Sequence, residues 1–185
     1  LVLTVDAPVQ GARDRERRAG FRLPPGTSAV NLDGAPPAAS LLDTAPTWDD
    51  VHWLQGITRL PVLLKGVMHL DDARQAATLG VAGLIVSNHG GRTLDTAVST
   101  AYALPRIADA VGSTLPLLVD GGIRRGTDVV KALALGARAV LVGRPCVWGL
   151  ANAGAVGAAH VLRLLRDEFE IAQVLCGCVT PADIT

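Results

Sequence analysis

The chain has little of what several protein classes need. Only three of its 185 residues are cysteines, aromatic residues make up 3%, and seventeen Lys and Arg balance seventeen Asp and Glu. Cys146, Cys176 and Cys178 are too few and too oddly spaced for a disulfide framework, so we expect free thiols and no metal site. A neutral, aromatic-poor chain also gives no reason to expect nucleic acid or an anionic membrane as partner.

Long hydrophobic runs are missing as well. No run approaches the roughly 20 apolar residues that span a bilayer, and the start, LVLTVDAP, lacks the basic flank and cleavage pattern of a signal peptide. We therefore expect a cytoplasmic protein. The first residue is not Met and lies inside an apolar β-like run, so we expect the chain to be part of something longer.

What the chain does contain is a series of short apolar runs bounded by turn residues. They show no polar alternation, which is typical of parallel strands covered on both faces. We predict strands at residues 1–7, 61–65, 82–87, 115–120 and 137–143.

Helical patterns separate these runs. Thr47 and Asp50 form a capping box that opens a helix through about Gln55. A second helix is predicted over 71–79, a third from a cap at Thr127 to Gly136, and a long one over about 153–175. Alternating strands and helices predict an α/β fold with right-handed crossovers.

Such a series fits a (β/α)8 barrel, in which a complete set of strands takes about 250 residues. We predict that this chain supplies about the last five strands of a single barrel domain, and that the missing strands lie upstream. Residues 19–46 are rich in Pro, Gly, Ala and Ser without a clear period. A loop this long is either a lid over the active site or a disordered insertion.

Polar residues gather where the predicted strands end, at the barrel face on which active sites are built. Lys65 ends one strand; the alternative is an exposed lysine just beyond it. His89, two glycines and Arg92 follow the next strand, which can place a base and a carboxylate-binding guanidinium in one pocket. We assign His52, His69 and His160 to structural or surface roles.

A second polar group suits a phosphate. The segment from Asp120 to Arg124 leads into a helix, and Gly143 and Arg144 follow the next strand. Free backbone N–H groups, a helix N-terminus and two arginines make an anion site suited to a phosphate monoester. Asp6 and Arg13 face the same end of the sheet by this topology, and the rest of the basic stretch 13–18 is interpreted as a solvated charge cluster.

Taken together in this order, Lys65-Gly66, Ser87-Asn-His-Gly-Gly-Arg92, Asp120-Gly-Gly-Ile-Arg-Arg-Gly-Thr-Asp128 and Gly143-Arg-Pro145 resemble the FMN-dependent 2-hydroxy-acid dehydrogenase family. That family includes glycolate and lactate oxidases and mandelate oxidases and dehydrogenases. The likeness covers nearly the whole chain, apart from about residues 26–45.

The resemblance implies a role for each matching position. His89 would be the catalytic base and Asp6 its orienting partner, while Arg13 and Arg92 would hold the substrate carboxylate. For the cofactor FMN, it implies the ring contacts Thr4, Lys65 and Ser87, the ribityl contact Asp120, and a phosphate site of Gly121, Gly122, Arg124, Gly143 and Arg144.

The resemblance further implies oxidation of a 2-hydroxy acid to a 2-oxo acid, with FMN reoxidised by O2 to give H2O2 or by another acceptor. An aromatic substrate of the mandelate type is our first expectation, and a homotetramer is implied as the assembly. The alternatives are another FMN barrel, such as an isomerase or an IMP-dehydrogenase-like enzyme, and a truncated half-barrel without catalysis.

Overall fold

The computed structural model describes residues 1–9, 11–32 and 45–185. Its centre is a parallel sheet in which each strand lies beside its successor in the sequence, the order of consecutive strands in a barrel. The strands are β1 (Val2–Thr4), β2 (Leu63–Lys65), β3 (Gly83–Val86), β4 (Leu117–Val119) and β5 (Ala139–Val140). All five predicted strands are confirmed, although each is shorter than its apolar run.

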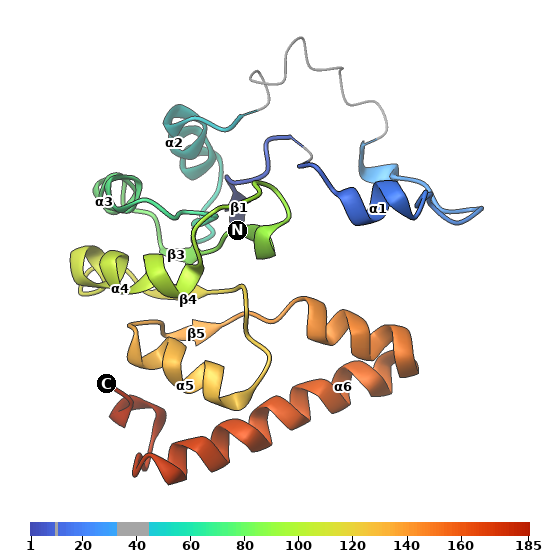
Figure 1. Cartoon of the computed structure of the whole chain (residues 1–185). Helices are drawn as coiled ribbons and strands as arrows, with labels where there is room; N and C mark the ends of the chain where they lie inside the picture. The colour runs from blue at the N-terminus through green and yellow to red at the C-terminus, as the bar shows by residue number, and fades with distance from the viewer. Residues whose placement is uncertain (10, 33–44) are drawn as a thin grey trace.

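Helices connect the strands as a parallel sheet requires. Helices α2, α3 and α4 lie along one side of the sheet, α5 and α6 pack together below it, and α1 stands apart on the opposite side (Figure 1). Their bounds are α1 (Asp14–Arg18), α2 (Trp48–Ile57), α3 (Leu70–Thr78), α4 (Thr100–Val111), α5 (Gly126–Ala134) and α6 (Arg144–Leu175). Among the described residues, no helix has the length and apolar character needed to cross a membrane.

The capping box predicted for α2 is present. Thr47 N donates to Asp50 Oδ2 at 2.7 Å, and Asp50 N donates to Thr47 Oγ1 at 3.3 Å. The hydrogen bond from the Thr47 backbone lowers the pKa of Asp50 below its ordinary value. The cap therefore fixes where the chain turns from loop into helix after residue 46.

Two predicted helix starts are wrong. Helix α5 begins at Gly126 rather than after a cap at Thr127, because Asp128 Oδ2 accepts the free N–H groups of Arg124 and Arg125 at 3.1 and 3.0 Å. Helix α6 begins at Arg144, well before 153, and its backbone leaves helical geometry at Ala153 and Gly154. The predicted helix is the longer part of α6, which follows this break.

Helix α4 was not predicted at all. Its buried face consists of Thr100, Ala103, Leu104, Ile107 and Val111, which is a regular helical spacing. Pro105 lies inside this helix and obscured the pattern, since proline in a helix interior normally breaks it.

The core lies between the sheet and the helices α2 to α4, and burial falls toward the two outer strands. Strand β3 is buried throughout, as its continuous apolarity predicted. Strand β1 departs from that prediction: Val2 is 52% exposed, because no further strand or helix covers its outer face in the described structure. The sheet is thus open along β1.

The segment 19–46, predicted as a lid or a disordered insertion, is only partly described. Residues 19–31 are exposed throughout and end in a short 3-10 turn at Val30–Leu32. Residues 33–44 lie outside the described residues, so both interpretations of the segment stay predictions.

Candidate active site

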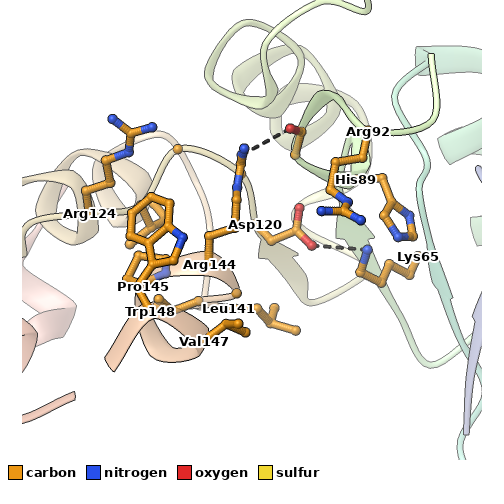
Figure 2. A pocket seen from close by; sticks show the side chains of 16 residues that line it. Lys65, His89, Arg92, Asp120, Arg124, Leu141, Arg144, Pro145, Val147 and Trp148 are labelled. Atoms are coloured by element: carbon orange, nitrogen blue, oxygen red, sulfur yellow. Dashed lines mark hydrogen bonds and ion pairs between the residues drawn. The ribbon is translucent and has the colours of Figure 1, made fainter. Parts of the chain in front are cut away.

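A pocket of about 400 Å³ lies where the carboxyl ends of the strands meet the loops that follow them. Figure 2 shows Lys65, His89, Arg92 and Asp120 at one end and Arg124 at the other. The predicted site residues that line it are Lys65, His89, Arg92, Asp120, Gly121, Gly122, Arg124, Gly143 and Arg144. Thr4, Asp6, Arg13 and Ser87 do not line it.

Lys65 is the centre of the polar end. Its Nζ lies 3.1 Å from Asp120 Oδ2 and donates to Ser87 Oγ at 2.9 Å. Both charged side chains are more than four-fifths buried, so the ammonium has the negative partner that a strand-end lysine needs. The alternative of an exposed lysine beyond the strand is thereby excluded.

Ser87 joins this lysine to the histidine. The residue is fully buried at the end of β3, and its Oγ also accepts the backbone N–H of His89 at 3.1 Å. In this structure Ser87 therefore orients both Lys65 and the turn at His89.

His89 is held from two sides. Its Nδ1 lies 3.0 Å from Asp6 Oδ1, and its backbone has a φ of 55°, in the left-handed region that costs energy for a residue with a side chain. A carboxylate only accepts hydrogen bonds, so Nδ1 is the ring nitrogen that donates to Asp6, and Nε2 is the ring nitrogen that Asp6 does not contact. In this geometry His89, which lines the pocket, can act as a base through Nε2.

Gly66 is the reason Asp6 can reach the histidine. A Cβ at Gly66 would lie 2.6 Å from Asp6 Cγ, and the backbone there has a φ of 107°. Only glycine combines that conformation with so close an approach. The pair Lys65-Gly66 thereby supplies a cation to the pocket and room for Asp6 beside it.

Several buried polar atoms here have no partner within the described protein: Asp6 Oδ2, Arg13 Nε and Asp120 Oδ1. Unpaired buried polar atoms are rare in folded proteins and indicate a ligand or water. Asp120 Oδ1 lies at the pocket, where a hydroxyl donor would satisfy it. That orphaned acceptor, together with the cations Lys65, Arg124 and Arg144 that line the same pocket, fits a ligand that carries both hydroxyl groups and a phosphate.

The other end of the pocket combines positive charge with an apolar wall. Arg144 is the first residue of α6, and its Nη2 donates to Gly90 O at 3.0 Å, across to the loop that carries His89 (Figure 2). Val147 and Trp148, which the sequence reasoning missed, line the same wall. They lie one turn after Arg144, so a helix start predicted at Arg144 would have revealed them.

The two arginines predicted to hold a carboxylate are placed differently. Arg92 lines the pocket, whereas Arg13 precedes α1 and meets Arg92 only through Glu16, which contacts both. Thr4 ends β1 opposite Lys65 in the strand register. His52 and His160 are exposed, and His69 Nδ1 accepts from Asp71 N at 3.3 Å at the start of α3, so all three lie outside the site.

Comparison with known proteins agrees with this geometry. A family model described as FMN-dependent dehydrogenase matches residues 1–185. The chain belongs to this family. An L-lactate oxidase of Nostoc sp. is 49% identical over 199 positions, which cover 100% of this chain and 54% of that protein. A peroxisomal (S)-2-hydroxy-acid oxidase of Oryza sativa is 47% identical over 200 positions, with the same two shares.

Solved structures of mandelate oxidases are also similar to this chain. A mandelate oxidase with (S)-2-phenylpropionate has a TM-score of 0.88 and 47% identity, over 98% of this chain and 52% of that one. A mandelate oxidase mutant with the C4a-OH-FMN adduct has a TM-score of 0.89 and 46% identity, over 99% and 53%. The chain therefore spans about half the length of these relatives.

Family membership settles two predictions. The fold is the α/β barrel of this family, of which the chain supplies five parallel strands, and FMN is the cofactor of an FMN-dependent dehydrogenase. The orphaned Asp120 Oδ1 and the cations at both ends of the pocket fit that cofactor.

Proposed function

We propose that this chain carries the catalytic base and most of the FMN site of an enzyme that oxidises a 2-hydroxy acid to the 2-oxo acid. The observation that carries the proposal is the His89–Asp6 pair at 3.0 Å, beside Arg92 and the Lys65–Asp120 ion pair at 3.1 Å. A base, a guanidinium for a carboxylate and a buried cation thus meet at one pocket end, and this chemistry needs all three.

Each of these side chains has a role in the proposed reaction. Arg92 binds the substrate carboxylate and thereby orients the α-carbon. Arg13 supports Arg92 through Glu16, which contacts both arginines. His89 Nε2 takes up one proton, and Asp6 stabilises the imidazolium that forms. That proton is the hydroxyl proton if the α-hydrogen leaves with its electron pair, or the α-proton itself if the electrons follow separately; the residues are the same in both schemes.

The cofactor site is assigned from the same pocket. FMN bound there would take up the two electrons that the substrate loses. Lys65 would lie at the flavin ring, where its positive charge would favour the reduced cofactor. Thr4 and Ser87 do not line the pocket, so their ring contacts stay predictions. Asp120 would accept from the ribityl hydroxyls, and the phosphate would lie among Gly121, Gly122 and Arg124, next to Gly143 and Arg144 at the start of α6.

The relatives' names support a proposal for the electron acceptor and for the substrate. We propose O2 as the acceptor, giving H2O2, because the similar proteins are named lactate, 2-hydroxy-acid and mandelate oxidases. We keep an aromatic acid of the mandelate type as the first substrate to test, against lactate and glycolate. A homotetramer and a cytoplasmic location stay predictions.

We also propose that activity requires an upstream segment that completes the barrel. Two observations support this: the sheet is open along β1, and this chain covers only 54% of the length of the Nostoc relative. Residues 1–185 together with such a segment and FMN are called the assembled enzyme below.

The test is anaerobic mixing of the assembled enzyme with a panel of 2-hydroxy acids while flavin absorbance is followed. Bleaching of the flavin and a matching yield of 2-oxo acid are expected, and H2O2 on readmission of air. If the assembled enzyme binds FMN but no 2-hydroxy acid reduces it, the proposal is wrong and the alternative of a half-barrel without catalysis is favoured.

A further inference from the structure

The carboxylate of Glu16 lies between the two arginines assigned to the substrate. Its Oε2 is 3.3 Å from Arg13 Nη1, and its Oε1 is 3.1 Å from Arg92 Nη2. One carboxylate therefore bridges two guanidinium groups that belong to distant parts of the chain. A bound hydroxy acid would present the same chemical group to the same two partners.

A second contact, made by Gly11, holds the chain near Glu16 against the loop of Arg92. Gly11 packs against the backbone of the loop that carries Arg92: a Cβ there would lie 2.6 Å from the Arg92 carbonyl oxygen. Such an approach leaves no room for a side chain, so the chain just before Arg13 is seated on residues 92–93. The bridge thus does not depend on one flexible ion pair alone.

The charges of the three side chains decide what the arginines will bind. Two guanidinium groups and one carboxylate leave one positive charge, which matches one carboxylate of a ligand. All three side chains are partly exposed, at 34% for Arg13, 42% for Arg92 and 39% for Glu16. The remaining N–H groups of Arg92, which lines the pocket, are left to meet a ligand, while the buried Arg13 Nε has no partner within the described protein.

We propose that Glu16 is a positioning residue that sets the specificity of the carboxylate subsite. It holds Arg13 and Arg92 side by side and cancels one of their charges, so that the subsite accepts a ligand with one carboxylate and disfavours a ligand with two. This inference rests on the proposed function, because it assumes that Arg92 binds the acid group of the substrate.

The experiment compares acetate with malonate, which differ by a second carboxylate, at a pH at which both are fully ionised. Their affinities for the FMN-loaded assembled enzyme are measured by calorimetry and by the change in flavin absorbance. Glu16→Gln frees one guanidinium for the second carboxylate. The ratio of malonate to acetate affinity is expected to rise about tenfold, the value of one charged hydrogen bond.

Two further variants separate positioning from a general charge effect. Asp14→Asn removes a negative charge from the same helix, but Asp14 faces Arg17 at 4.0 Å and not the subsite, so the ratio is expected to stay at the wild-type value. Glu16→Asp keeps the carboxylate and is expected to restore most of the wild-type preference. A purely structural role of Glu16 would not produce this pattern.

The outcomes distinguish the two proposals. An assembled enzyme that is reduced by 2-hydroxy acids, but whose malonate to acetate ratio is the same in Glu16→Gln and in the wild type, overturns the assignment of Glu16 alone. An equal rise in Asp14→Asn overturns it too. An enzyme that no 2-hydroxy acid reduces overturns the proposed function and this inference with it.

Discussion

His89 Nδ1 lies 3.0 Å from Asp6 Oδ1, although 83 positions separate the two residues in the chain. Asp6 follows the first strand and His89 follows the third, and the parallel sheet brings both strand ends to one edge. The contact fixes the orientation of the imidazole and leaves Nε2 as the nitrogen that accepts a proton.

His89→Gln is expected to lower the rate of flavin reduction by at least about 10²–10⁴-fold, while FMN and substrate still bind, because a general base acts in the transition state. Anaerobic stopped-flow absorbance measures the rate, and spectral titration measures binding. His160→Gln, at an exposed position of α6, is the control. A His89 variant with a nearly normal reduction rate would show that another group is the base.

Arg92→Lys is expected to weaken the apparent affinity for hydroxy-acid substrates roughly tenfold or more, since a point-charge ammonium does not reproduce the planar fork on a carboxylate. Steady-state kinetics of an acid and its neutral ester give the comparison, and Arg74→Lys, on the exposed face of α3, is the control. If acid and ester lose the same amount, Arg92 does not bind the carboxylate.

Lys65→Met is expected to cost about 1–3 kcal/mol in the free energy of unfolding, because it leaves the Asp120 carboxylate without its cation at 17% exposure. It should also lower the flavin midpoint potential, since a cation near the ring stabilises the reduced anion. Denaturant melts and spectroelectrochemistry measure the two effects, with Lys131→Met on α5 as control. An unchanged potential would contradict contact between Lys65 and the flavin.

Glu168→Gln is expected to lower the Tm at neutral pH. The Gly126 backbone N–H, bonded to Glu168 Oε2 at 2.9 Å, and Arg125 lower the pKa of Glu168 below its ordinary value of 4.5. A lowered folded-state pKa means stabilisation that is complete above 4.5 and is lost as the pH falls through the folded value. The gap in Tm between the variant and the wild type should therefore close in acid.

Glu170→Gln is the matched control for that measurement, because Glu170 pairs with Arg166 within α6 and does not reach α5. A gap that is independent of pH, or as large for Glu170→Gln, would speak against the link between α5 and α6.

Residues 1–185 expressed without an upstream segment are expected to be poorly soluble and free of flavin. Strand β1 pairs only with β2 in the described structure, so its other edge offers unpaired N–H and C=O groups beside the exposed Val2. Absorbance, size-exclusion chromatography and thermal melts test this. A cooperative melt with bound FMN from these residues alone would contradict the need for barrel completion.

The five strands, the capping box of α2 and the polar residues at the strand ends could be predicted from the sequence, because each depends on a local pattern. Apolar runs between turn residues predicted all five strands, and the motifs at the strand ends, taken together, identified the family. Local pattern failed where two signals conflict. Pro105 obscured α4, and the charged stretch before Arg18 concealed the short helix α1.

The contacts between polar groups of the site could not be predicted in this way, because they join distant parts of the chain. His89 meets Asp6, Arg92 meets Glu16 and Arg144 meets Gly90 across separations of 83, 76 and 54 positions. Sequence periodicity reports on neighbours one turn or one pleat apart, whereas these contacts depend on how loops from different strands fold over one edge of the sheet. For that reason the roles of Asp6 and Arg13 were assigned by resemblance. The contact between Glu16 and Arg92 could be identified only from the structure.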